Sequence, residues 1–86
     1  LENNEQKIAI YGAGMTGIFY ASILEDRVAF FIDDDPNTHG SKILGKPVYS
    51  FQYRPERIKI LNAVPGPNSK TVYNKRKAEC DMLNLF

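Results

Sequence analysis

The chain has 86 residues and carries 11 basic and 10 acidic side chains, so its formal net charge is +1. This length suits one small domain, and the near-neutral charge gives no reason to expect nucleic acid as a partner. One cysteine and one histidine exclude an intrachain disulfide and a four-ligand zinc site, so we expect no metal centre.

The charge is uneven along the chain. Residues 1–43 carry seven acidic and three basic side chains, whereas residues 44–86 carry three acidic and eight basic ones. No stretch approaches the roughly 18 apolar residues of a membrane span, and no basic segment precedes an apolar one as in a secretory signal. We therefore expect a cytoplasmic protein without a membrane span in this segment. Because the chain opens on Leu1 rather than methionine, we expect it to be part of a larger protein.

The first half predicts a strand, a helix and a second strand. Residues 1–6 are polar and predict a frayed lead-in. Residues 7–11 (KIAIY) predict a buried strand. Residues 12–17 form a turn into a helix that continues through 18–25; because that helix is apolar nearly all round, we expect it to be covered on more than one side. Residues 28–32 (VAFFI) predict a second strand, of the kind found in parallel sheets.

The second half continues with further strands and a last helix. Its composition predicts a loop over 33–40, a turn and short strand over 43–49, a connector over 50–57, a strand over 58–64 and a helix over about 70–84. Asn68 or Ser69 can cap that helix. The order of elements predicts an α/β fold in one domain, residues 1–86, with a small or truncated Rossmann-like parallel sheet and flanking helices.

Residues 12–17 (GAGMTG) match the pattern G-x-G-x-x-G between a predicted strand and a predicted helix. Gly12 permits the tight turn, Gly14 lets a pyrophosphate approach the backbone, and Gly17 lets the helix pack close to the sheet. The free N–H groups of Gly14, Met15 and Thr16 would point at a phosphate, and the Thr16 hydroxyl can donate as well. The motif therefore predicts a phosphate-bearing ligand.

An acidic residue supplies the second half of this pattern. Asp33 follows Gly12 by 21 positions and ends the second predicted strand, where an acid holds ribose hydroxyls in dinucleotide-binding folds. Asp34 and Asp35 come next, and three carboxylates would repel a 2′-phosphate, which favours NAD over NADP. A uridine or adenosine ribose fits Asp33 equally well. The alternative is that the glycine turn only joins strand to helix and that the acids cap the following turn.

Four short motifs occur in an order that resembles a known family: IYGAG at 10–14, FIDDDP at 31–36, HG at 39–40 and ILGKPVY at 43–49. They resemble the Rossmann-like N-terminal domain of nucleotide-sugar epimerase/dehydratases of bacterial polysaccharide biosynthesis. The same module precedes some sugar acyltransferases. The resemblance covers about residues 7–65 and implies a domain that binds a nucleotide or nucleotide-sugar beside a separate catalytic domain.

The resemblance assigns roles to individual positions. It implies that Gly12, Ala13, Gly14 and Gly17 form the phosphate loop, that Asp33 and Asp34 lie near the ribose or base, and that the edge of the ligand crevice is lined by Val64 and Pro65. No second glycine motif occurs in the chain, so we expect the catalytic dehydratase domain to lie outside it.

Other features are weaker candidates. Tyr73 and Lys77 have the Y-x-x-x-K spacing of short-chain dehydrogenases, but five tyrosines make a chance match expected. His39 is more typical of a solvated loop residue than of a general base. Cys80, which falls in the expected last helix, is more typical of a small core residue than of a nucleophile. A solvated helix face is the simplest interpretation of the basic cluster Lys70, Lys75, Arg76 and Lys77; the alternative is a contact with phosphates or with an acidic partner.

We predict no catalytic residue in the chain itself. The main hypothesis is a domain that binds NAD(H) or a nucleotide-sugar, with an adjacent catalytic domain or a second copy of the chain as its partner. One alternative is a regulatory nucleotide-sensing domain that dimerises through the apolar helix at 18–24. Another is an interaction domain whose crevice is vestigial.

Overall fold

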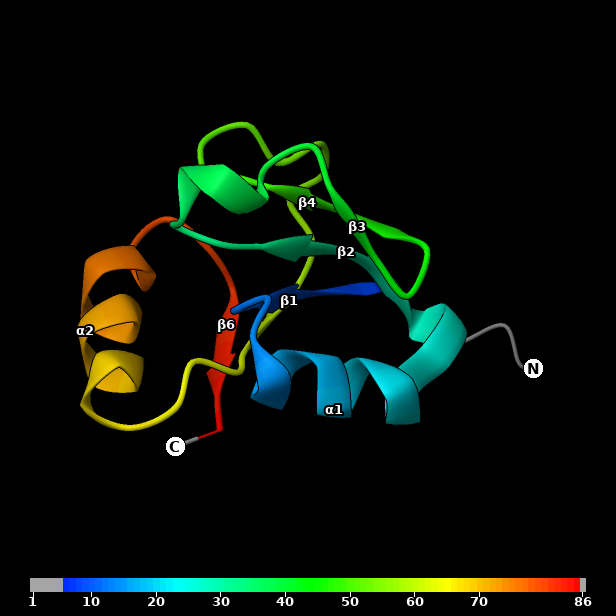
Figure 1. Cartoon of the computed structure of the whole chain (residues 1–86). Coiled ribbons are helices and arrows are strands. Elements are labelled where there is room, and N and C mark those ends of the chain that lie inside the picture. The colour runs from blue at the N-terminus through cyan, green and yellow to red at the C-terminus, as the bar shows by residue number, and fades with distance from the viewer. Residues whose placement is uncertain (1–5, 86) are drawn as a thin grey trace.

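A computed structural model describes residues 6–85 of the chain (Figure 1). The described residues form a six-stranded sheet in the order β3-β4-β2-β1-β5-β6. The predicted lead-in at residues 1–6 lies, apart from Gln6, outside the described residues.

The elements follow one another as strands joined by two helices and two short 3-10 turns. They are β1 (Ile8–Tyr11), α1 (Met15–Leu24), η2 (Glu25–Arg27), β2 (Val28–Ile32), η3 (Pro36–Thr38), β3 (Lys42–Ile43), β4 (Lys46–Tyr49), β5 (Ile60–Asn62), α2 (Pro67–Arg76) and β6 (Met82–Asn84). All neighbouring strands are parallel except β3 and β4, which form an antiparallel hairpin. The predicted α/β fold, with a Rossmann-like parallel sheet and flanking helices, is confirmed.

The strand order reverses at the centre of the sheet. From β1 the chain passes through α1 to β2 and on to β4 on one side, and β5 then returns to pair with the other side of β1. The neighbouring carboxyl ends of β1 and β5 are therefore a topological switch point, where open α/β sheets form their crevice.

Both faces of the sheet are covered. Successive residues of β1 point to opposite sides of the sheet, so they pack in two separate cores. Ile8 and Ile10 pack in a core with Ala21 of α1, whereas Ala9 and Tyr11 pack in a second core with Val72 of α2. Each fully buried large apolar side chain contributes about 1.5–3 kcal/mol. Burial on both faces explains why the strands are continuous apolar runs rather than alternating apolar and polar ones.

Two glycines of the turn are required by the backbone geometry. Gly12 has a φ of +109°, and a Cβ there would lie 3.1 Å from Cγ2 of Val64. A Cβ on Gly17 would overlap the carbonyl oxygen of Gly12 and lie 3.3 Å from Cγ2 of Ile10. The turn and the first helix therefore approach β1 and the β5 loop too closely for any side chain at these two positions.

The predicted helix over 70–84 is wrong at both ends. Helix α2 begins at Pro67 with Gly66 as its N-cap, because the fixed φ of proline suits the first helical position; neither Asn68 nor Ser69 is the cap. The helix stops at Arg76. Residues 82–84 instead form β6, which pairs in parallel with the edge of β5.

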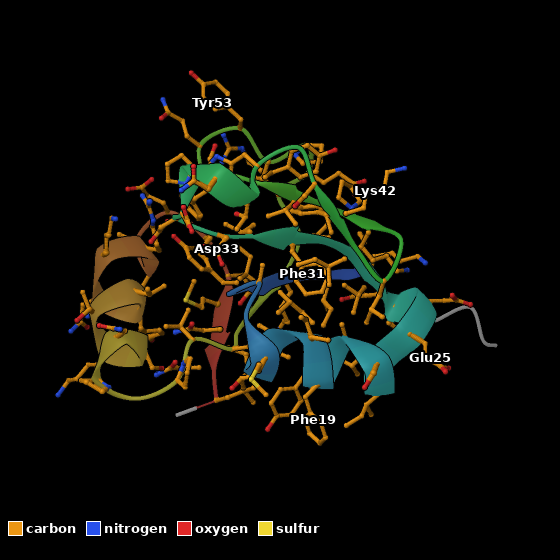
Figure 2. All side chains as sticks on the ribbon, in the orientation of Figure 1. Phe19, Glu25, Phe31, Asp33, Lys42 and Tyr53 are labelled. Carbon is orange, nitrogen blue, oxygen red and sulfur yellow. The ribbon has the colours of Figure 1, made fainter. Side chains whose placement is uncertain are left out.

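The prediction that the first helix is covered on more than one side is also wrong for the described part of the chain. Met15, Phe19 and Ile23 are 89%, 59% and 59% exposed. Figure 2 shows Phe19 on the side of α1 that faces away from the sheet. The spacing of four residues places these three side chains in one row along the outer face of the helix.

Candidate functional site

A cleft of about 490 Å³ lies at the switch point, at the carboxyl ends of β1, β2 and β5. In Figure 1, α2 stands at the end of the sheet toward which β1 and β2 point. The cleft is lined by Tyr11, Gly12, Gly14, Met15, Thr16, Asp33, Asp34, Ala63, Val64, Pro65, Asn68, Thr71 and Val72.

The glycine turn offers unpaired main-chain donors to this cleft. The Gly12 N–H donates to the carbonyl oxygen of Ile32 at 2.7 Å, and the Ala13 N–H donates to Asp33 Oδ2 at 2.7 Å. Within residues 6–85, the N–H groups of Gly14, Met15 and Thr16 have no acceptor, and α1 has no side-chain cap. A helix start of this kind attracts an anion, because its free N–H groups and the helix dipole act together.

Asp33 stabilises the turn as well as lining the cleft. Its Oδ2 accepts from the Ala13 N–H, and its Oδ1 accepts from the Asp35 N–H at 2.9 Å. The His39 Nε2 lies 2.7 Å from the Asp33 carbonyl oxygen, to which it donates. His39 lies in the turn after η3, as expected for a loop residue, but it is half-buried and does not line the cleft. Figure 2 shows Asp33 at the carboxyl end of β2.

Asp34 points to the other side of the sheet and joins a charged network. Its Oδ1 accepts from the Tyr11 hydroxyl at 2.5 Å and lies 3.6 Å from Nη2 of Arg76. The Arg76 Nε donates to the Tyr11 hydroxyl oxygen at 3.2 Å, and Nζ of Lys75 lies 3.9 Å from Asp34 Oδ2. The end of α2 is thereby connected to β1 and to the residue two positions after β2.

Arg76 is held in this network by an aromatic ring. Its guanidinium lies 4.3 Å from the ring centroid of Phe51, and that of Arg54 lies 3.9 Å from the same centroid. Burial, together with the hydrogen bond to Asp34, raises the pKa of the Tyr11 hydroxyl above its ordinary value. Tyr11 is therefore protonated at neutral pH and donates to the carboxylate.

The far edge of the cleft is fixed by a buried amide. Asn62, which is fully buried, donates from Nδ2 to the Ser69 carbonyl at 3.0 Å and to Asn84 Oδ1 at 2.8 Å. Its Oδ1 accepts from the Val64 N–H at 3.2 Å. The Ser69 hydroxyl also donates to Asn84 Oδ1, at 2.9 Å. One side chain at the end of β5 therefore fixes the loop at Val64, the start of α2 and β6.

The cleft brings together most of the residues singled out from the sequence. Gly12, Gly14, Met15, Thr16, Asp33, Asp34, Val64 and Pro65 line it. Ala13 and Gly17 do not: Ala13 donates its N–H to Asp33, and Gly17 is buried against Gly12 and Ile10.

Five further residues that line the cleft were not predicted from the sequence: Tyr11, Ala63, Asn68, Thr71 and Val72. Tyr11 was assigned to a buried strand, and its position directly before Gly12 was the signal that it ends beside the turn. The three residues of α2 share one helix face by their spacing. Asn68 was not placed on this face because the helix was predicted to begin near residue 70.

Tyr73, Lys77 and Cys80 do not line the cleft. Lys77 Nζ lies 5.7 Å from the centroid of the Tyr73 ring, so the two side chains do meet, but neither lines the cleft. Cys80 is half-buried in the turn after α2, where it packs against the α2-side core, and burial raises the pKa of its thiol. The prediction that Cys80 lies in the last helix is wrong.

Within the described part of the chain, no helix is long and apolar enough to cross a membrane.

Comparison with known proteins yields one informative similarity. No family model matches the chain, and neither does any curated protein. A solved structure, that of UDP-D-quinovosamine 4-dehydrogenase from Vibrio fischeri, is similar with a TM-score of 0.72 and 25% sequence identity, over 94% of this chain and 80% of that chain. The chain therefore has a Rossmann-like fold that a nucleotide-sugar enzyme also has.

Proposed function

We propose that the chain binds a nucleotide, either a nucleotide-sugar or NAD(H), in the cleft at the switch point. The observation that carries the proposal is the set of unpaired N–H groups of Gly14, Met15 and Thr16 at the edge of that cleft. A phosphate group would accept from these donors at the positive end of α1. The similarity to an enzyme named for a UDP-sugar supports the nucleotide-sugar as the first ligand to test.

The space in front of the turn supports this ligand class. A Cβ built on Gly14 meets no atom within 4 Å, so the position is open where a pyrophosphate would lie. Asp33, beside the turn, retains free lone pairs on both carboxylate oxygens and can accept a ribose hydroxyl. We propose that Asp33 and Asp34 disfavour a 2′-phosphate and hence NADP, and that Val64 and Pro65 contact the far part of the ligand.

Within a larger protein, the chain would act as a non-catalytic binding domain in nucleotide-sugar or polysaccharide biosynthesis. The ligand would be held here while an adjacent domain carries out the chemistry. This role rests on the family resemblance of the motifs at 10–14, 31–36 and 43–49 together with the structural similarity.

Calorimetric titration with UDP-N-acetylglucosamine, NAD and NADP tests the proposal, using wild type and Gly14→Val. Gly14 is in an extended conformation, with φ −93° and ψ −166°, which a β-branched residue adopts readily. We expect the variant to fold as wild type does and to lose binding, because its side chain fills the phosphate position. Ser22→Val is the matched control, since it adds a valine to an exposed position of α1 outside the cleft.

A wild-type chain that binds none of the three ligands contradicts the proposal, as does undiminished binding by Gly14→Val. Preference for NADP over NAD would contradict the role given to the two acids.

One observation favours the regulatory alternative: the exposed row of Met15, Phe19 and Ile23 on the outer face of α1. A nucleotide-sensing domain that dimerises through this helix would bury these side chains between two copies. Sedimentation velocity over a range of protein concentrations, with and without NAD, tests this alternative, which requires a dimer through α1.

A further inference from the structure

We propose that Lys75 is a second contact for the phosphate groups of the ligand, provided by the α2 side of the cleft. The inference rests on the proposed function, because it names a ligand-binding residue of the same cleft. For the basic cluster that contains Lys75, the sequence favours a solvated helix face and leaves a phosphate contact as the alternative.

The helical register places Lys75 at the cleft. Thr71 lines the cleft, and Lys75 follows it by one turn on the same face of α2. Asn68, which also lines the cleft, lies seven residues before Lys75 on that face. The Lys75 ammonium is 3.9 Å from Oδ2 of Asp34, and Asp34 is itself a lining residue. The ammonium group therefore lies at the rim of the cleft.

The two cations near Asp34 differ in how firmly they are held. The Arg76 side chain is 20% exposed, stacks on Phe51 and donates to the Tyr11 hydroxyl. The Lys75 side chain is 53% exposed, and its distance to Asp34 exceeds that of a good hydrogen bond. Arg76 therefore suffices to neutralise Asp34, and Lys75 can move to a ligand at little cost.

The negative charge of the cleft indicates that a phosphate ligand needs a cation beside it. Among the described residues that line it, the charged ones are Asp33 and Asp34, both acidic. A ligand with two phosphates would bring further negative charge next to these carboxylates. Uncharged N–H groups at the start of α1 offset this repulsion only in part, whereas an ammonium group is a point charge suited to phosphate oxygens. Of the two cations beside Asp34, Lys75 is the more exposed one and can turn toward the ligand.

Binding of a nucleoside diphosphate and its monophosphate to Lys75→Gln tests the inference. The diphosphate and monophosphate are UDP and UMP; if the wild type binds ADP more tightly than UDP, they are ADP and AMP. We expect the variant to bind the diphosphate about tenfold more weakly, as for the loss of one charge-assisted hydrogen bond, and the monophosphate with a smaller loss. The loss should shrink in about 0.5 M KCl, where the attraction is screened. Lys75→Arg should retain most of the affinity.

Lys77→Gln is the matched control. It removes the same charge from the C-cap of the same helix, but the Lys77 ammonium lies over the Tyr73 ring and outside the cleft. We expect it to leave the affinity unchanged and both variants to melt at the wild-type temperature. Equal losses in the two variants, an equal loss for monophosphate and diphosphate, or no loss in Lys75→Gln would overturn the inference while leaving the proposed function intact. If the wild type binds neither nucleotide pair, nor UDP-N-acetylglucosamine, nor NAD, the proposed function itself fails.

Discussion

The two helices beside the cleft contribute to it in different ways. Helix α1 contributes main chain: a turn without side chains at Gly12 and Gly14, and unpaired N–H groups. Helix α2 contributes side chains, among them Thr71 in the cleft and Arg76 in the network with Asp34. The first side is specified by residues adjacent in sequence. The second depends on contacts between residues 22 to 65 positions apart, such as Asn62 with Asn84 and Tyr11 with Arg76.

Gly17→Ala is expected to have the largest effect on stability, because it disrupts the α1 side at its closest approach. The new Cβ would overlap the Gly12 carbonyl oxygen, so the backbone of the turn must move. We expect a loss of about 3 kcal/mol in the free energy of unfolding, measured by urea denaturation. Gly14→Ala is the control, since its Cβ meets no atom within 4 Å. Equal stability of the two variants would show that α1 is not held against the turn as described.

Asn62→Ala tests the α2 side at its buried centre. The substitution leaves the Val64 N–H and the Ser69 carbonyl without their side-chain partner, and an unsatisfied buried polar group is costly. We expect unfolding to become easier by about 2 kcal/mol. Asn74→Ala, at an exposed position of α2, should change stability by much less. A loss as small in Asn62→Ala as in Asn74→Ala would contradict the role of the amide in joining β5, α2 and β6.

Tyr11→Phe tests the network in which β1 contacts Asp34 and Arg76 of α2. Its hydroxyl joins Asp34 to Arg76, so we expect a loss of about 1 kcal/mol at neutral pH. The folded state raises the Tyr11 pKa and so holds the proton more tightly than the unfolded chain does. The stabilisation by this hydroxyl is therefore complete below the ordinary tyrosine pKa of about 10 and is lost as the pH rises above it.

Urea denaturation at about pH 8 and about pH 10.5 measures this dependence, on either side of the ordinary tyrosine pKa. The difference in stability between wild type and Tyr11→Phe should be smaller at the higher pH. Tyr53→Phe, at a 76% exposed position, should show no such change. A constant difference would indicate that the hydroxyl is not buried in the network.

Phe19→Gln is expected to have the smallest effect. The side chain is 59% exposed on the outer face of α1, and surface substitutions change stability by about 0.5 kcal/mol or less. Thermal melts of the variant at low and high protein concentration check this. If the melting temperature of the variant falls further below that of the wild type as protein concentration rises, a second copy covers this face, which would favour the regulatory alternative.

The sequence predicted the α1 side better than the α2 side for a physical reason. Strand β1, the glycine turn, α1 and β2 are each encoded by local patterns, and their order leaves one arrangement. Strand β6 has no such pattern: Met82–Asn84 reads equally well as the end of a helix. It becomes a strand because β5 offers an unpaired parallel edge, to which it binds over three residues. Pairing between distant segments overrides local propensity here.

The same contrast applies to the residues of the cleft. Gly14 and Asp33 could be named because their spacing matches a phosphate-binding pattern. Thr71 could not, since its presence in the cleft depends on where α2 starts and how it crosses the end of the sheet. The hydrogen bond of His39 could not be predicted, because its acceptor, the Asp33 carbonyl, belongs to the backbone.

The hydrogen bonds of Asp33 affect how mutagenesis of this residue must be interpreted. Because its carboxylate accepts from the N–H groups of Ala13 and Asp35, replacing it with alanine removes a support of the loop together with any ribose contact. Weaker nucleotide affinity in Asp33→Ala would then combine two causes that the titration alone does not distinguish. A hydrogen-exchange measurement of the Ala13 amide in the ligand-free variant would separate them, since that amide exchanges faster only if the turn itself has loosened.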